Sequence, residues 1–331
     1  MNTREKKYFS KYKKPLVEIP DLVESQLHSY EAFLNGGLQS AIMEFSPIID
    51  YSEKKYDLEF LEFSMEAPEY DEYFARENKL MYQGRLKSRV RLTNKVTDTV
   101  KEEEIFMTEI PFMTSHGTFI INGIERVIVP QLARSYGVFF MMDDHAKGNF
   151  FGAKIIPARG AWIEFETNKD GAIYVRIDKK RKFAATALLR IFGLEGNQDI
   201  KDAFADDEVA LKQVEKTLKK DTSLTKEEAY VDVYRRVRDG EIASPDALKE
   251  YFTAIFGKDL YDLSEVGRYH FNKRFGLTLP KQNGKYQETL TLEDLIIIIK
   301  KIAKMNITPG ARADDIDHLG SRRVRFVGEL M

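Results

Sequence analysis

Four side chains near the end of the chain have the chemistry to bind a metal ion. Asp314, Asp315, Asp317 and His318 stand close together, and carboxylate and imidazole groups are common ligands of divalent cations. The segment lacks the Asp-x-Asp-x-Asp-Gly spacing and the closing Glu of a calcium loop. Three arginines follow between residues 322 and 325. Pairing of the carboxylates with these arginines is the simpler interpretation, so no metal is expected.

A run of four cations, residues 179–182, follows a predicted strand. Such a run can contact the phosphates of a nucleic acid, which adds salt-dependent affinity without sequence preference. An ordinary solvated turn has the same composition. The run alone does not separate these two interpretations.

Trp162 is the only tryptophan of the chain and lies in the segment ARGAWIEF. A lone tryptophan in a strand usually packs in a core. The neighbouring Arg159 and Gly160 favour a second interpretation, in which the indole stacks on a nucleobase at the strand edge. The pattern alone favours core packing.

The composition limits the classes of function. The chain has 331 residues, enough for about two domains, with a formal net charge of −2 and no cysteine. Disulfides and thiol chemistry are therefore excluded, and any nucleic-acid contact must come from a local basic patch. No apolar run approaches the length of a membrane span, so a cytoplasmic location without membrane contact is expected. No nucleophile elbow, phosphate-binding loop, dinucleotide fingerprint or zincin motif is present.

The first part of the chain predicts a sheet with one covering helix. Apolar residues at helical spacing predict a helix over residues 21–34, ended by Gly36 and Gly37. Asn122 and Gly123 predict a turn between two short strands. Alternating patterns predict strands over residues 56–67, 84–92, 105–111 and, in two pieces, 119–140.

The second part predicts three strands followed by helices. Asp170 and Gly171 indicate a hairpin, while Ser244 and Thr291 are expected N-caps. The strands are expected at 153–156, 162–167 and 172–178, and the helices at 183–192, 209–218, 226–237, 245–256 and 292–304. Residues 314–331 resemble the start of another helix.

Residues 117–140, GTFIINGIERVIVPQLARSYGVFF, mix β-branched and aromatic residues with charge. Glu125, Arg126, Gln131 and Arg134 stand in this otherwise apolar segment, and such groups are seldom buried unless paired. The pattern alone predicts a strand pair with its charges at the surface.

This segment closely resembles one near the start of the β subunit of bacterial RNA polymerase. The resemblance runs from near Lys14 to the last residue and is poor only over about 196–222. Its other anchors are IPDLVESQLHSYEAFL at 19–34, AKIIPARGAWIEFE at 153–166, VRIDKKRKFAATALLR at 175–190, YDLSEVGRYHFNKRF at 261–275 and DDIDHLGSRRVRFVGEL at 314–330.

The resemblance implies the N-terminal portion of a subunit several times longer. It implies an α+β fold of two domains, each a mainly antiparallel sheet with covering helices: a protrusion (β1) at 1–138 plus 315–331, and a lobe (β2) at 139–314. The complete enzyme is a nucleotidyltransferase of transcription, associated with the nucleoid. No catalytic residue and no cofactor are expected in this chain, since the catalytic Mg²⁺ of the family lies in the β′ subunit.

In the family these two domains form a wall of the DNA channel. Matched residue by residue, Arg134, Asp317 and Arg322 would line a pocket for an unstacked non-template guanine, and Trp162 would stack on the neighbouring base. A carboxylate can accept from the guanine N1–H and N2–H₂ groups, and an arginine can donate to O6, N7 or phosphate.

Two further lobe residues match family positions near the same strand, Asp178 and Lys179. The family often has arginine where Lys179 stands, so the charge is kept but the planar fork is lost. Ser321 replaces a common asparagine, which is expected to matter little.

The resemblance also implies partners. The expected ones are DNA, the α, β′, ω and sigma subunits, and two regulators that add a strand to the protrusion: the transcription–repair coupling factor and CarD-type proteins. Val100, Lys101 and Glu102 match the docking motif, just before the strand expected from Ile105. The alternative is an ordinary charged edge strand that prevents aggregation and docks no regulator. The sequence leaves two other functions open: a pure docking module that binds no DNA when isolated, and a metal-dependent hydrolase using residues 314–318.

Overall fold

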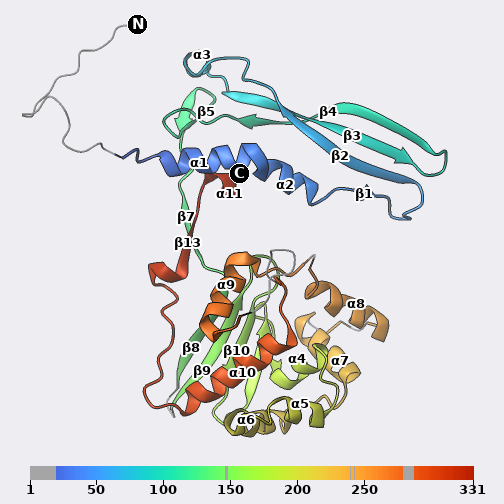
Figure 1. Ribbon diagram of the computed structural model, residues 1–331, viewed down its shortest axis with the longest axis vertical. Coiled ribbons are helices and arrows are strands. Elements are labelled where there is room, and N and C mark those ends of the chain that lie inside the picture. Colours follow the sequence, from blue (N-terminus) through green and yellow to red (C-terminus); the bar gives the residue numbers. More distant parts are fainter. Residues whose placement is uncertain (1–19, 146–147, 239, 242, 259, 279–286) are drawn as a thin grey trace, which may run out of the picture. The chain divides into compact units, whose positions relative to one another are not determined.

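The computed structural model of the protein describes residues 20–145, 148–238, 240–241, 243–258, 260–278 and 287–331. The chain forms two compact units, Met1–Leu132 with Val324–Met331, and Ala133–Arg323. Figure 1 shows helices and sheets in both. The predicted α+β class is therefore confirmed. The basic residues 1–14 lie outside the described residues.

The first unit is built on a four-stranded antiparallel sheet of order β1-β2-β3-β4. The last strand is longer than predicted, because it begins at Thr99 and not at Ile105. Its charged first half has partners on the neighbouring strand; Glu102, for example, is bound by Arg91 at 2.7 Å. The strands are β1 (Ile48–Ile49), β2 (Tyr56–Met65), β3 (Gln83–Asn94) and β4 (Thr99–Pro111).

One face of this sheet carries a ladder of ion pairs. Arg91 stands between two carboxylates, 3.4 Å from Glu59 on β2 and 2.7 Å from Glu102 on β4. The remaining basic side chains of β3 are paired in the same way: Arg85 with Glu109, Lys87 with Glu66 and Arg89 with Glu62. The row of cations on this strand is therefore neutralised by glutamates.

The helix of the first unit continues through the glycines that were predicted to end it. After α1 (Glu24–Ala32), the chain makes a π-helical turn, η1 (Phe33–Gly37), and continues as α2 (Leu38–Met43). Gly37 keeps right-handed helical dihedrals, with φ −61° and ψ −43°. The prediction of a stop was wrong because a π turn absorbed the two glycines without changing the hand of the helix.

A small apolar cluster joins this helix to the end of the chain. Tyr30, Phe119 and Val327 are buried together, and the Tyr30 hydroxyl donates to the Pro111 carbonyl at 2.6 Å. Burial raises the pKa of Tyr30 to about 12. The unit also holds α3 (Glu72–Glu77), α11 (Val327–Leu330) and a hairpin of β5 (Phe119–Ile121) and β6 (Ile124–Arg126).

The turn of that hairpin was correctly predicted. Asn122 and Gly123 both have positive φ, 52° and 78°, as a two-residue hairpin turn requires. A Cβ on Gly123 would lie only 2.7 Å from the Lys79 Cα, so the close packing of this turn also requires glycine.

The second unit is built on a five-stranded sheet of order β12-β11-β10-β9-β8. All neighbouring strands are antiparallel. The predicted hairpin at Asp170 and Gly171 is confirmed, because it joins the paired strands β10 and β11. The strands are β8 (Gly137–His145), β9 (Gly148–Ile156), β10 (Ile163–Thr167), β11 (Ile173–Ile177) and β12 (Phe183–Ala184).

Helices surround this sheet, with α9 beside β8 and α10 beside β9 (Figure 1). Ser244 and Thr291 are the N-caps that were predicted, since their hydroxyls accept from Ala247 and Asp294. The predicted helix at 183–192 begins as strand β12. The helices are α4 (Ala185–Ile191), α5 (Asn197–Ala203), α6 (Glu208–Leu218), α7 (Lys226–Val237), α8 (Pro245–Ile255), α9 (Ser264–Phe275) and α10 (Leu292–Ile307).

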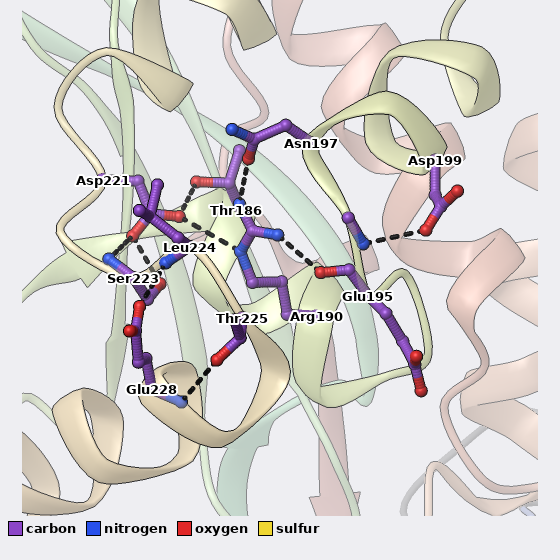
Figure 2. A network of polar contacts seen from close by, with 11 residues as sticks. Thr186, Arg190, Glu195, Asn197, Asp199, Asp221, Ser223, Leu224, Thr225 and Glu228 are labelled. Carbon is purple, nitrogen blue, oxygen red and sulfur yellow. Dashed lines mark hydrogen bonds and ion pairs between the residues drawn. The ribbon is translucent and has the colours of Figure 1, made fainter.

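A buried arginine links three segments of this unit (Figure 2). Arg190 on α4 is fully buried; its guanidinium donates to the Glu195 carbonyl at 2.8 Å and to Asn197 at the start of α5. Its Nε lies 3.7 Å from the Asp221 carboxylate, which also accepts from Thr186 at 2.5 Å. The region 196–222, where the resemblance is poor, is therefore tied to the core at both ends.

Residues 314–331, predicted as the start of a helix, form a strand at Arg322–Arg325 and are α-helical only at α11, Val327–Leu330. After η2 (Leu319–Ser321), β13 (Arg322–Arg325) pairs with β7 (Gln131–Arg134). The domain boundaries were expected at 138/139 and 314/315, whereas the two compact units divide at 132/133 and 323/324. Residue 314 is held in the second unit because its carboxylate accepts from the Phe140 N–H at 2.6 Å. None of the helices in the described ranges has the length and apolar character that a membrane crossing requires.

Candidate nucleic-acid interface and docking edge

The register of the five-stranded sheet places several candidate residues at one end. Gly137 pairs with Ile156, Ile155 with Ile163, and Ile163 with Ile177. The start of β8, the start of β10 and the end of β11 therefore meet at the same edge of the unit. Since neighbouring strands lie about 4.8 Å apart, β8 and β11 are separated by roughly 15 Å.

Trp162 and the turn after β11 are joined directly at this end. The backbone N–H of Trp162 donates to the Asp178 carboxylate at 2.8 Å, and the backbone N–H of Asp178 donates to the Trp162 carbonyl at 2.9 Å. Asp178 and Lys179 both have positive φ, 48° and 61°, as in a tight hairpin turn closed by the bond from Lys180 N–H to Ile177 O. The structure thus brings Trp162, Asp178 and Lys179 together.

The cationic run at this turn divides into two parts. Lys179 and Arg181 are exposed. Lys182 is half-buried, and its ammonium lies 3.3 Å from the Asn168 side chain, 3.8 Å from Glu166 and 5.1 Å from the Tyr174 ring centroid. The first part of the run is therefore more open to a phosphate than Lys182, which already has these partners.

Lys154 lies beside Trp162 and was not predicted from the sequence. Its ammonium lies 4.9 Å from the centroid of the Trp162 ring and is paired with Glu164, directly across the strands. The side chain is almost fully buried. The signal in the sequence was a lysine within an apolar strand. A buried cation needs a carboxylate partner and can also pack over an aromatic ring.

The loop that presents Trp162 is held by a second segment. Arg159 forms a bridge with Asp262, whose N–H donates to the Arg159 carbonyl at 2.9 Å. Gly160 has φ +113°, and a Cβ there would lie 2.8 Å from both Leu260 O and Tyr261 Cδ2. Burial raises the pKa of the Tyr261 phenol above its usual value. Glycine therefore allows the loop to rest on the buried Tyr261 ring.

Arg134, Asp317 and Arg322 form a second group at the same end of the unit. Arg134 and Arg322 lie on the paired strands β7 and β13, and the Ser135 N–H donates to the Ser321 carbonyl at 3.0 Å. The Arg322 guanidinium binds the Asp317 carboxylate at 2.6 Å, and the Asp317 side chain is 72% exposed. The arginine thus orients a carboxylate that faces solvent.

The acidic cluster 314–318 is used for structure. Asp314 binds Arg274 at 2.7 Å, and the Asp315 carboxylate accepts from the backbone N–H groups of Asp317 and His318. His318 Nδ1 in turn accepts from the Gly320 N–H. Within the described ranges no three His, Cys, Asp or Glu side chains come together as a candidate metal site.

Val100, Lys101 and Glu102 lie inside β4 rather than before it. This strand ends the order β1-β2-β3-β4, so it is an edge of the first unit's sheet. All three residues are exposed. Glu102 points to the face that carries the ion pairs, where it binds Arg91, and Lys101 is opposite Leu92 on the other face. An edge of this kind offers backbone groups to an added strand.

Comparison with known proteins identifies the family. The family model described as RNA polymerase Rpb2, domain 2, matches residues 137–325, which is nearly the whole second unit. A DNA-directed RNA polymerase subunit beta of Syntrophomonas wolfei is 44% identical over 98% of this chain and 28% of its own length. Those of Gloeobacter violaceus and Synechococcus sp. are 41% and 40% identical over 95% and 96% of this chain.

The chain spans between 27% and 29% of the length of these relatives. The identities extend over both units, beyond the range of the family model. The chain therefore belongs to the family of RNA polymerase β subunits.

Proposed function

We infer that the chain acts in transcription as part of the β subunit of a DNA-directed RNA polymerase, with the first unit as the protrusion and the second as the lobe. Its role in this proposal is to form a wall of the DNA channel and contact non-template DNA, without contributing a catalytic group. The supporting observation is that a single end of the second unit's sheet carries Trp162, Asp178 and Lys179 together with the Arg134–Asp317–Arg322 group.

The two groups offer the chemistry that an unstacked strand needs. The Asp317 carboxylate, oriented by Arg322, can accept from the Watson–Crick edge of a guanine, and Arg134 can donate to base or phosphate. The Trp162 ring can stack on a neighbouring base, a contact of about 1–3 kcal/mol. Lys179 adds salt-dependent phosphate attraction.

The partners follow from membership in the assembly. The α, β′, ω and sigma subunits and DNA are the proposed partners, and the catalytic Mg²⁺ would be held by β′. Regulator docking is a second role, supported by the exposed edge strand β4 and its residues Val100, Lys101 and Glu102. A transcription–repair coupling factor or CarD-type protein would add a strand there.

The DNA contact is tested with two fluorescein-labelled single-stranded oligonucleotides that differ at one guanine. Anisotropy titrations across a salt series should give tighter binding of the guanine strand by the wild-type chain. Asp317→Ala should remove this preference, worth about 1–3 kcal/mol, whereas Asp246→Ala, at an exposed aspartate on α8, should keep it. Equal binding of both strands by the wild-type chain contradicts the guanine pocket.

Docking is tested with a Tudor-like regulator domain in a separate titration. Lys101→Ala and Glu102→Ala should weaken its binding and leave the circular dichroism spectrum unchanged, because both side chains are exposed. If the wild-type chain binds the regulator domain but no DNA at any salt concentration, the pure docking module is the correct description. Unchanged affinity in both variants rules out this edge.

A further inference from the structure

A pocket of about 290 Å³ lies beside the start of β8 in the second unit. Residues 135–139 line one side, and α9 contributes His270, Lys273 and Arg274. Ser321 closes the pocket from the segment before β13. None of the residues considered so far as DNA contacts lines it, yet Arg134 and Arg322 directly neighbour its serines in the sequence.

Gly267 allows α9 to approach the strand this closely, while Gly137 supplies a backbone conformation that favours glycine. A Cβ on Gly267 would lie 2.9 Å from the Tyr136 Cβ, nearer than real Cβ contacts come. Gly137 has φ +133°, and a Cβ there would touch the His270 Cβ at 3.7 Å. The helix is thereby held with His270 and Lys273 at the entry of β8.

The charges around the pocket leave a local excess of cations. Asp314 is bound by Arg274 at 2.7 Å and Asp317 by Arg322 at 2.6 Å, so the nearby carboxylates already have partners. Among the described residues, Lys273 has no carboxylate partner, and its ammonium lies 5.8 Å from the centroid of the Tyr269 ring.

A cation in the last turn of a helix also complements the helix dipole, and this explains part of the pattern. Arg274 is accounted for structurally, since it donates to the Val138 carbonyl at 3.2 Å, binds Asp314 and lies over the Phe140 ring at 4.7 Å. Lys273 and His270 instead line an open pocket. The helix dipole alone does not explain why His270 and Lys273, from adjacent turns of α9, line the same pocket.

We propose that this pocket binds a backbone phosphate of the DNA strand, through Lys273 and His270, next to the base site of Arg134, Asp317 and Arg322. Lys273 supplies the charge, and an imidazole N–H of His270 donates in either protonation state. The inference rests on the proposed DNA contact and adds a subsite to it. Bonding between Ser135 and Ser321 places the phosphate and base subsites side by side.

The test measures the slope of log K against log salt for single-stranded DNA between about 50 and 200 mM salt. Each phosphate contact on a single strand contributes about −0.7 to this slope. Lys273→Gln should make the slope less negative by that amount and weaken binding of the guanine and guanine-free strands equally. Lys219→Gln is the matched control, because this exposed lysine follows α6, whose Thr217 binds Ile173 at the other end of β11.

The measurements distinguish a failure of this inference from a failure of the proposed function. If Asp317→Ala removes the guanine preference while Lys273→Gln keeps the wild-type slope, the phosphate pocket is wrong and the base site stands. If Lys273→Gln makes the slope less negative but no guanine preference exists, the pocket stands and the base site fails. If the wild-type chain shows no DNA binding at the lowest salt, both are overturned.

A second measurement identifies the source of the phosphate. Inorganic phosphate is titrated against the chain while the His270 imidazole is followed by NMR, assigned with His270→Gln. A DNA subsite predicts weak binding, in the millimolar range or above, that DNA competes away. Micromolar binding of inorganic phosphate that DNA does not displace would mean a site for a free phosphate compound and would overturn the proposal.

Discussion

Trp162 and Asp178 are joined by two hydrogen bonds. The backbone N–H of Trp162 donates to the Asp178 carboxylate at 2.8 Å, and the backbone N–H of Asp178 donates to the Trp162 carbonyl at 2.9 Å. Because Trp162 is the only tryptophan, its fluorescence reports this relationship without interference from other tryptophans. The exposed turn and the segment that carries Trp162 thus form one local unit, at the start of β10 and the end of β11.

We expect Asp178→Ala to reduce the quenching of Trp162 fluorescence by single-stranded DNA. The change removes the acceptor of the Trp162 N–H and places alanine at a positive φ, which it tolerates poorly. Asp178→Asn keeps the acceptor and tolerates this conformation, so it should retain most of the quenching. Equal quenching in the wild-type chain and both variants would show that Asp178 does not position the indole.

Gly160→Ala should displace the loop that carries Trp162. Its new Cβ would meet Leu260 O and Tyr261 Cδ2 at 2.8 Å, in addition to the strain of a positive φ. Gly193→Ala is the control, since Gly193 also has positive φ but nothing within 4 Å of a built Cβ. The Trp162 emission maximum of the DNA-free chain should shift in the first variant only. A shift of the same size in both variants would attribute the effect to backbone strain alone.

Arg190→Ala should destabilise the second unit by about 3–5 kcal/mol, because it leaves the Asp221 carboxylate, 2% exposed, without its cation. Lys212→Ala removes an ion pair with Glu208 that is mostly exposed and should cost no more than about 0.5 kcal/mol. Urea unfolding monitored by Trp162 fluorescence, which lies in the same unit, measures both. A loss below about 1 kcal/mol in Arg190→Ala would contradict a structural role for the buried pair.

The link between α10 and the turn that precedes α6 should weaken in acid. The hydrogen bond from Lys300, at 2.6 and 2.8 Å, lowers the pKa of the Asp206 carboxyl, and a smaller loss of hydration opposes this only in part. The contribution of this pair to stability is therefore present above the unfolded pKa of about 3.9 and is lost as the pH falls through the lower, folded value.

Asp206→Asn should show a smaller decrease in urea midpoint than the wild-type chain between neutral pH and the folded pKa of the aspartate. High salt should reduce the difference, because the Asp206 side chain is mostly exposed. Parallel pH profiles for the two proteins at low salt would exclude Asp206 as a source of acid sensitivity.

Local chemistry decided which elements could be predicted from the sequence. The Asn122-Gly123 and Asp170-Gly171 turns, the caps at Ser244 and Thr291 and the helix α7 all depend on neighbours within a few residues. The prediction that the helix ends at Gly36 and Gly37 was wrong, because a π turn is compatible with the packing around Tyr30. Strand β13 could not be predicted, because its partner β7 lies nearly two hundred residues earlier.

The sequence by itself determined the family and most of the candidate contacts, because ordered motifs over the whole chain carry that information, but Lys154, His270 and Lys273 emerged only from the fold. Only the tertiary structure decided which contacts act together. Sheet register brought Trp162 to Asp178 and placed both at the same end as Arg134 and Arg322. Long-range pairing also buried Lys154 under the indole and neutralised the cations of β3. Charge in a sequence does not state its partner, since the partner is set by packing between distant segments.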